Sequence, residues 1–183
     1  AHLFQDTTEK FSERPFLYFE DEMWTYGHTN KAANSMARYL VSTGVKHGDR
    51  VVLFMENRPS FLISLLALNK IGAIAVLINT SLTGDPLIHC INSSDAVKCI
   101  VGAERASPLE DVLNQTNITK QEDLLWAHDT AQYSLPDWAI DLKAQLDLSD
   151  DKNLEETNSV RVKDVACYIF TSGTTGVPKA AVC

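Results

Sequence analysis

The sequence predicts an α/β fold, a layered and parallel-rich sheet with flanking helices, and two observations carry this prediction. Apolar runs of strand length occur at 51–55, 73–78 and 97–101, and such continuous runs are typical of strands that are covered on both faces. Between the runs lie two helical segments, each with a proline near its start. Strands that alternate with helices favour parallel pairing through right-handed crossovers.

Two elements are expected before the first buried strand. Phe16–Phe19 and Met23–Thr25 are short strand-like runs separated by three acidic residues, which predicts a hairpin. After Thr25 the apolar residues recur at helical spacing, and Gly44 can end this helix in the left-handed conformation. The apolar stripe, which we interpret as core, consists of Ala33, Met36, Ala37, Leu40 and Val41.

The buried strands and their helices then follow in the order β-α-β-α-β. Gly48–Arg50 turns the chain into the first strand, and Pro59 suits the first turn of a helix that stops at Gly72. Thr83–Asp85 offers side-chain caps before Pro86 opens a second, shorter helix.

Beyond residue 101 the pattern is less regular. We expect a helix, a strand and a second helix at Ser107–Thr116, Leu124–Trp126 and Pro136–Leu148. Seven acidic and two basic residues lie between Asp137 and Glu156, which predicts a solvated connector. The chain therefore divides into an α/β body at 1–130, an acidic connector at 131–160, and a strand with a loop at 161–183.

Composition excludes several classes of function. The chain has 183 residues, of which 45% are hydrophobic and 22% charged, as expected of an ordinary globular protein. Its formal net charge of −8 gives no general attraction to nucleic acid, so we expect no nucleic-acid partner. Any phosphate group must therefore be bound locally.

The cysteines and histidines show no metal-binding spacing. No CxxC or HExxH pattern occurs, so we expect no metal held by side chains of this chain. The cysteines lie in apolar runs, where a free thiol acts as a small hydrophobic group, and we interpret them as reduced and the protein as cytoplasmic. They are Cys90, Cys99, Cys167 and Cys183.

The clearest chemical signal follows the last long apolar run, Asp164–Phe170, which leads directly into the polar segment Thr171–Lys179. Gly173 and Gly176 allow backbone N–H groups to turn toward an anion, and Lys179 adds a positive charge. Four hydroxyl donors complete the set: Thr171, Ser172, Thr174 and Thr175. The segment predicts a phosphate cradle, although its order differs from both GxxxxGK[ST] and GxGxxG. The apolar run 180–183 that follows it is expected to be an unpaired strand.

Together with Tyr168, this segment resembles the signature loop of the adenylate-forming, or AMP-binding, superfamily, which includes acyl-CoA synthetases, luciferase and peptide-synthetase adenylation domains. The branch of the superfamily that is most similar is that of the fatty acid transport proteins (very-long-chain acyl-CoA synthetases). The residues that carry this similarity are Phe54–Arg58, Leu77–Thr80, Leu82, the pair His89–Cys90 and Lys179–Ala181. The resemblance implies that the fold is part of the large N-terminal domain of such an enzyme.

The resemblance also implies an activity. A long- or very-long-chain fatty acid would be activated with ATP and Mg²⁺ to acyl-AMP, and the acyl group would then pass to CoA. The implied phosphate-binding residues are Tyr168, as the residue that positions the loop, and Thr171, Ser172, Gly173, Thr174, Thr175, Gly176 and Lys179. Contacts to Mg²⁺, CoA, adenine and ribose would lie mainly beyond Cys183, so the chain alone is not expected to be catalytic. Contact with a membrane surface would also involve regions outside it.

Two alternatives stay open at this point. The chain could be a non-catalytic nucleotide-binding or interaction module, or part of another acyl- or aryl-CoA synthetase of the same superfamily.

A separate question concerns Glu56, Asn57 and Arg58, a polar trio between a buried strand and a proline-started helix. We interpret this trio as a turn rather than as part of an active site.

Overall fold

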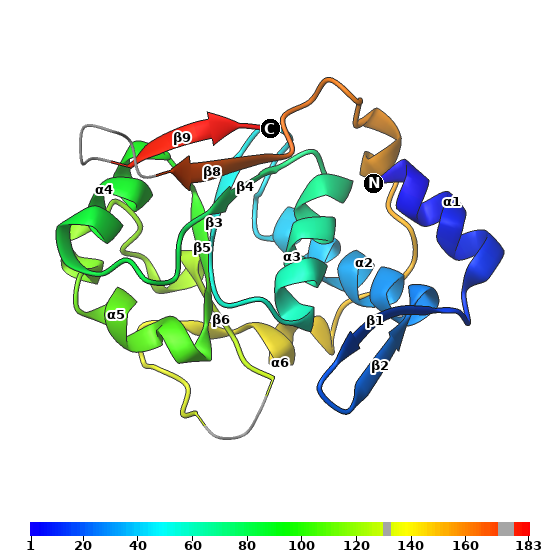
Figure 1. The fold of residues 1–183 in the computed structure, drawn as a ribbon, viewed down its shortest axis with the longest axis horizontal. Coiled ribbons are helices and arrows are strands. Elements are labelled where there is room, and N and C mark those ends of the chain that lie inside the picture. Colours follow the sequence, from blue (N-terminus) through cyan, green and yellow to red (C-terminus); the bar gives the residue numbers. More distant parts are fainter. Residues whose placement is uncertain (130–132, 172–177) are drawn as a thin grey trace.

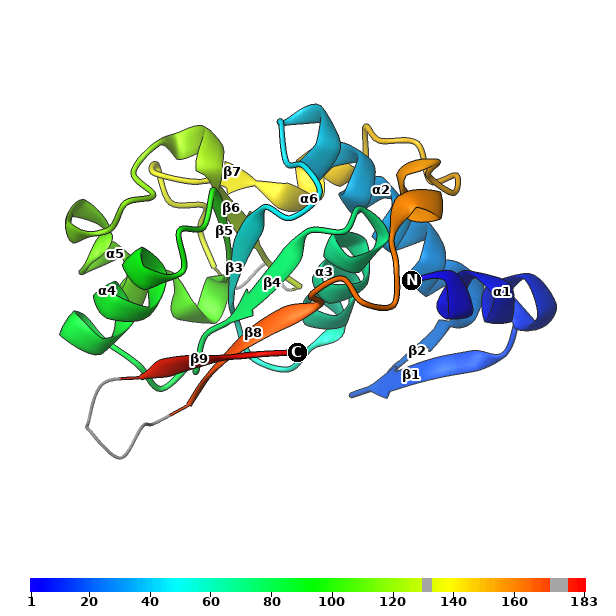
Figure 2. The same ribbon diagram turned by 90° about the horizontal axis from the view of Figure 1, so that it is seen from above.

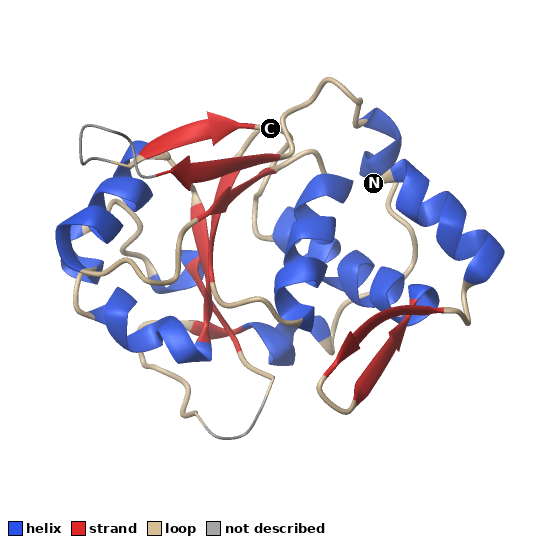
Figure 3. Ribbon diagram, viewed as in Figure 1, coloured by secondary structure: helices blue, strands red, loops and turns tan. Residues whose placement is uncertain are grey.

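The computed structural model describes residues 1–129, 133–171 and 178–183. Its centre is a seven-stranded sheet with the order β7-β6-β5-β3-β4-β8-β9, which lies between two layers of helices (Figures 1 and 3). Neighbouring strands are parallel except for the pair β8 and β9. The strands are β3 (Arg50–Phe54), β4 (Ile74–Leu77), β5 (Lys98–Gly102), β6 (Leu124–Ala127), β7 (Ile140–Asp141), β8 (Cys167–Thr171) and β9 (Lys179–Val182). The predicted fold class is confirmed.

The apolar runs form strands because the sheet buries both of their faces. Along β3, Val51 and Leu53 belong to one buried cluster, while Val52 and Phe54 belong to a second cluster on the other face. This alternation follows from the two-residue period of a strand. A run that lacks polar residues is therefore what a central strand of this sheet requires.

Helices cover both faces of the sheet, as Figure 2 shows. Helices α2 (Tyr26–Ser42) and α3 (Pro59–Lys70) contribute to the first cluster, whereas α4 (Gly84–Ser93) and α5 (Ala106–Glu110) contribute to the second. The expected helix ends are confirmed, because Gly44 and Gly72 have φ values of +94° and +68°. None of the helices in the described residues has the length and apolar character that a membrane span needs.

The predicted hairpin is confirmed as β1 (Pro15–Phe19) paired antiparallel with β2 (Glu22–Thr25). Helix α1 (His2–Phe11) was not predicted. It is attached by aromatic packing, since the ring centroid of Phe4 lies 5.0 Å from that of Phe16 and 5.7 Å from that of Tyr26. These contacts join segments that are separate in the sequence, so a local apolar period does not reveal them.

The helix expected at Ser107–Thr116 is shorter than predicted. Helix α5 ends at Glu110, and short 3-10 helices flank it at Ala103–Arg105 and Leu113–Gln115. After Glu110 the backbone bonds tighten from a four-residue to a three-residue spacing, for example from Val112 N–H to the carbonyl of Leu109 at 3.1 Å. The tightened turns bring the chain back toward the sheet. A third 3-10 helix, at Gln121–Asp123, comes directly before β6.

The prediction of a helix at Pro136–Leu148 is wrong for the first part of this range. Helix α6 spans Leu142–Leu146, and its N-cap Asp141 accepts a hydrogen bond from the N–H of Ala144 at 3.3 Å. Ile140 and Asp141 instead form the edge strand β7 beside β6. Pairing with a distant strand overrides the local helical pattern at these two residues.

The acidic connector is attached to the body more firmly than a solvated segment would be. The side-chain oxygen of Asn153 accepts hydrogen bonds from the amides of Asn30 and Asn34 on α2, at 3.1 and 3.0 Å. Leu154 is buried, as is Thr157 in a 3-10 helix at Glu156–Ser159. Acidic side chains of the segment remain exposed, so the charge pattern indicates the outer surface of this segment but not its packing.

Candidate functional site

Strands β8 and β9 form the two sides of the phosphate-binding motif. Thr171 and Lys179 face each other in the antiparallel register, and the Thr171 hydroxyl donates to the carbonyl of Lys179 at 3.4 Å. The structure therefore brings the two ends of the motif together at the tip of a strand pair. The motif residues Ser172, Gly173, Thr174, Thr175 and Gly176 lie outside the described residues.

Tyr168 lies at the centre of this arrangement. It pairs with Val76 of β4 on one side and with Val182 of β9 on the other. Its side chain packs against the second buried cluster. A residue held in this way fixes the strand that leads to the motif, which is compatible with the positioning role that the resemblance implies for it.

Strand β9 is paired on one side, which corrects the expectation of an unpaired strand at 180–183. Its partner is β8, with Phe170 opposite Ala180 and Ile169 opposite Ala181. All four residues of β9 are exposed. The apolar run indicates a strand but does not indicate which strand it pairs with, so its pairing with β8 could not be predicted.

A contact from α4 reaches the far end of the motif. The Nε2 atom of His89 lies 3.1 Å from the carbonyl oxygen of Pro178, so the ring can donate a hydrogen bond to the residue before Lys179. Sequence reasoning used His89 only as part of a family resemblance. The residues around His89 in the sequence do not indicate this contact, because Pro178 lies far away along the chain.

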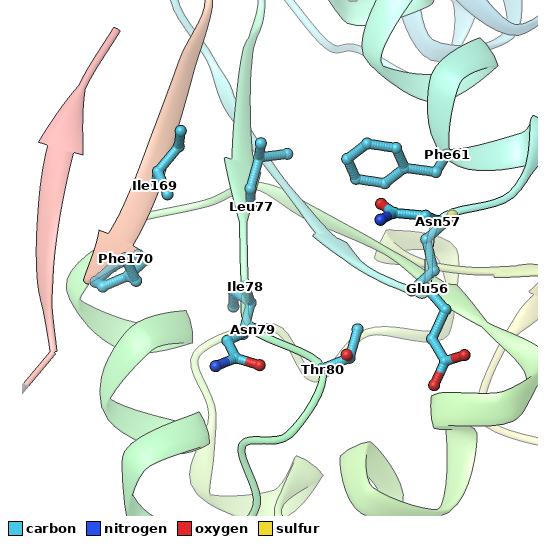
Figure 4. Close-up of a pocket in the computed structure, with 10 residues that line it drawn as sticks. Glu56, Asn57, Phe61, Leu77, Ile78, Asn79, Thr80, Ile169 and Phe170 are labelled. Atoms are coloured by element: carbon cyan, nitrogen blue, oxygen red, sulfur yellow. The ribbon is translucent and has the colours of Figure 1, made fainter. Parts of the chain in front are cut away.

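A cavity of about 540 Å³ opens at the carboxyl ends of β3, β4 and β8 (Figure 4); we call it the carboxyl-edge cavity. The chain leaves β3 for α3 on one face of the sheet and leaves β4 for α4 on the other. Ligands of open α/β sheets bind in a crevice of this kind, where neighbouring connections diverge. The lining residues are Met55, Glu56, Asn57, Phe61, Leu77, Ile78, Asn79, Thr80, Ile169 and Phe170.

The cavity and the motif share a border. Ile169 and Phe170 of β8 line the cavity, and the next residue in the chain is Thr171, where the motif begins. Figure 4 shows the polar side chain of Asn57 across the cavity from these two residues, and that of Asn79 beside Ile78 at the end of β4. The arrangement can therefore hold a polar ligand beside the described end of the motif.

An ion-pair network supports the wall that follows β3. Arg58 contacts Glu104 at 2.8 Å and Asp129 at 3.1 Å, while Glu56 forms an ion pair with Arg105. Glu104 also accepts the backbone N–H of Glu56 at 2.8 Å. Burial raises the pKa of the Glu104 carboxyl above its ordinary value, and the neighbouring Arg58 opposes this shift.

The polar trio forms the bent connection between β3 and α3, with Arg58 extended at the N-cap, but two of its members also line the candidate site. Glu56 and Arg58 both belong to the ion-pair network, and Glu56 and Asn57 line the cavity. The signal that could have placed them there is their position directly after a buried parallel strand, because the carboxyl ends of such strands share one edge.

The described residues do not form a metal centre. No group of three or more His, Cys, Asp or Glu side chains in residues 1–129, 133–171 and 178–183 is placed to hold a metal ion. Among the described residues that line the cavity, Glu56 supplies the carboxylate, and it forms an ion pair with Arg105.

Comparison with known proteins gives a consistent result. Residues 4–183 match the family described as AMP-binding enzyme. The chain is 32% identical over 182 residues to long-chain fatty acid transport protein 6 of Mus musculus, and 33% identical over 180 residues to the medium/long-chain-fatty-acid–CoA ligase FadD6 of Mycobacterium tuberculosis. Each alignment covers 98% of this chain but 28% of the relative.

Solved structures show the same fold. The anthranilate CoA ligase AuaEII, in complex with anthranoyl-AMP, superposes with a TM-score of 0.87 at 19% identity, over 98% of this chain and 33% of that one. A fatty acyl CoA synthetase of Mycobacterium tuberculosis superposes with a TM-score of 0.79 at 24% identity, over 100% of this chain and 34% of that one. The fold is therefore that of the N-terminal region of adenylate-forming ligases.

Proposed function

The chain belongs to the AMP-binding enzyme family, and from this premise we propose that it is the N-terminal part of an ATP-dependent ligase that joins long- or very-long-chain fatty acids to CoA. The observation that carries the proposal is the shared border of the phosphate-binding motif and the carboxyl-edge cavity, at Phe170 and Thr171. The fatty acid preference is supported by the names of the relatives, which are fatty acid transport proteins and a fatty acid–CoA ligase.

In the proposed reaction the motif binds the phosphates that leave as pyrophosphate. Thr171, Ser172, Gly173, Thr174, Thr175, Gly176 and Lys179 would supply hydroxyl, backbone N–H and ammonium donors. Donors that are already in place stabilise negative charge as it develops on the departing group. Tyr168 would hold the strand that carries them, since it pairs on both sides within the sheet.

The other components follow from the same proposal. ATP supplies the adenylate, Mg²⁺ neutralises phosphate charge and CoA accepts the acyl group, with Mg²⁺ and CoA contacts mainly outside this chain. We place the whole protein in the cytoplasm, with access to a membrane surface through regions outside the chain. We also retain the division into an α/β body at 1–130, an acidic connector at 131–160 and the motif region at 161–183.

Two measurements test the proposal at different levels. The chain should bind Mg-ATP in calorimetry, and Lys179→Ala should weaken binding about tenfold, because a charge-assisted contact to phosphate is worth roughly 1.5–3 kcal/mol. Lys163→Ala is the matched control, since Lys163 is an exposed lysine outside the motif. Equal affinities for Lys179→Ala and the unchanged chain would contradict the role of the motif.

The ligase activity is tested on a polypeptide that contains this chain and spans the full length of the relatives. We expect ATP–pyrophosphate exchange that depends on a long-chain fatty acid. Exchange with benzoate but not with fatty acids would instead favour an aryl-CoA synthetase. Binding of Mg-ATP without exchange for any carboxylate would favour a non-catalytic nucleotide-binding module.

A further inference from the structure

Two cysteines lie opposite each other at the open end of the β8–β9 strand pair. The N–H of Cys183 donates to the carbonyl of Cys167 at 3.0 Å, and the N–H of Cys167 donates to the carbonyl of Cys183 at 3.2 Å. This reciprocal exchange defines a hydrogen-bonded pair in an antiparallel ladder. The two side chains therefore project from the same face of the sheet.

The geometry of such a pair suits a disulfide. Directly opposed residues in a hydrogen-bonded antiparallel pair have Cα atoms about 5.5 Å apart, and disulfides most often join residues whose Cα atoms are about 5.5–6 Å apart. Burial, and in addition the neighbouring Cys183 thiol, raises the pKa of Cys167. The Cβ atoms of a hydrogen-bonded pair lie somewhat farther apart than those of a disulfide, so closure requires a small shift of the two strands as well as rotation of the side chains.

The pair differs from the other two cysteines in burial. Cys167 is half-buried, whereas Cys90 and Cys99 are buried in the second core cluster. Burial raises the pKa of Cys90 to about 11 and that of Cys99 to about 12. Because Cys90 and Cys99 are buried and the thiolate is the reactive form, these two thiols are protected from oxidation by a dissolved disulfide.

We propose that Cys167 and Cys183 form a reversible redox pair that closes into an intramolecular disulfide when the protein meets a small-molecule disulfide such as oxidised glutathione. The Cys183 thiol loses its proton to water, and its sulfur attacks one glutathione sulfur, which releases the first glutathione thiolate. The Cys167 thiolate then attacks the Cys183 sulfur of the mixed disulfide and releases the second. The protein loses two electrons and two protons, and oxidised glutathione is reduced to two thiols.

The bond would act on the strand pair that carries the phosphate-binding motif. It would link the first residue of β8 to the residue after β9, at the end of the pair opposite Thr171 and Lys179; Figure 2 shows this end near the C-terminus. A covalent closure reduces the freedom of the unfolded chain between the two residues. This inference concerns the thiols alone and does not depend on the proposed ligase activity.

Peptide mapping provides a direct test. The reduced chain is equilibrated with mixtures of reduced and oxidised glutathione, free thiols are alkylated, and the protein is digested with trypsin without reduction. Cleavage after Lys163 and Lys179 places Cys167 and Cys183 on different peptides. Mass spectrometry should detect these two peptides as one linked species, which increases with the oxidised fraction and disappears after treatment with dithiothreitol.

Variants and an unfolded control decide whether the fold directs this bond. Cys183→Ser should abolish the linked species, whereas Cys90→Ser should leave it unchanged. At one redox potential the linked fraction should be about tenfold higher in the folded chain than in urea, because the fold holds the thiols together. The proposal is overturned by a glutathione adduct on Cys183 with no linked species, or by equal linked fractions in the folded and unfolded chain.

Discussion

His89 is a single residue through which one helix contacts the phosphate-binding motif. Its ring nitrogen lies 3.1 Å from the Pro178 carbonyl oxygen, and Pro178 immediately precedes Lys179. The contact is to the main chain beside the motif, so we regard His89 as a positioning residue. Its effect would pass through the placement of the Lys179 backbone.

Removal of this contact should weaken nucleotide binding. We expect His89→Ala to raise the Kd for Mg-ATP about fivefold, because a neutral hydrogen bond contributes roughly 1 kcal/mol. His89→Gln should restore part of the affinity, since its amide can still donate to the carbonyl. Calorimetry on the 183-residue chain measures both, with His2→Ala in helix α1 as the control. An unchanged Kd in His89→Ala would show that the contact does not position the motif.

At the scale of elements, local patterns correctly predicted the strands and helices whose burial is regular along their whole length. Strand β3 is buried on both faces, and its continuous apolar run reports this directly. Helix α1 and strand β7 were missed because distant partners hold them, namely Phe16 and Tyr26 for α1 and strand β6 for β7. Pairing and packing across the chain leave no periodic signal in such short segments.

The junction between α3 and β4 depends on one glycine. Gly72 has a φ of +68°, and a Cβ atom there would lie 2.2 Å from the His47 ring. We expect Gly72→Ala to lower the free energy of unfolding by about 2–4 kcal/mol, because it combines an unfavourable backbone conformation with a steric clash. Urea denaturation measures this change.

Gly44 supplies the matched control for that substitution. It also has a positive φ, of +94°, but nothing lies within 4 Å of the position that a Cβ would take. Gly44→Ala should therefore cost only the backbone term, about 1 kcal/mol. If both variants were destabilised equally, contact with His47 would not contribute.

At the scale of the whole molecule, stability depends on a lysine inside the protein. Lys70 at the end of α3 is buried, and its ammonium nitrogen has no hydrogen-bond partner among the described residues. Burial lowers the pKa of Lys70 from 10.5 to about 8, because the charged form loses its hydration. Below pH 8 the folded protein carries this cost, which is on the order of 3 kcal/mol at about 1.4 kcal/mol per pKa unit.

This cost predicts a particular pH dependence. Between pH 8 and 10.5 the unfolded chain keeps the Lys70 proton while the folded chain releases it, so this residue's contribution to stability rises with pH. Lys70→Met should raise the free energy of unfolding at pH 7 and lose that advantage by about pH 10.5. Urea denaturation of both proteins across this range measures the difference. A difference that stays constant with pH would contradict the lowered pKa.

The sequence by itself determined the α/β class, the hairpin, the central strands and the family, because each rests on a local pattern or a short motif. Only the tertiary structure decided that β8 lies beside β4, that Glu56 and Asn57 border the same cavity as Phe170, and that His89 reaches Pro178. It also decided that Cys167 and Cys183 face each other. Strand order and helix placement minimise exposed apolar surface over the whole chain at once, so neighbours distant in sequence are selected by packing rather than by any local period.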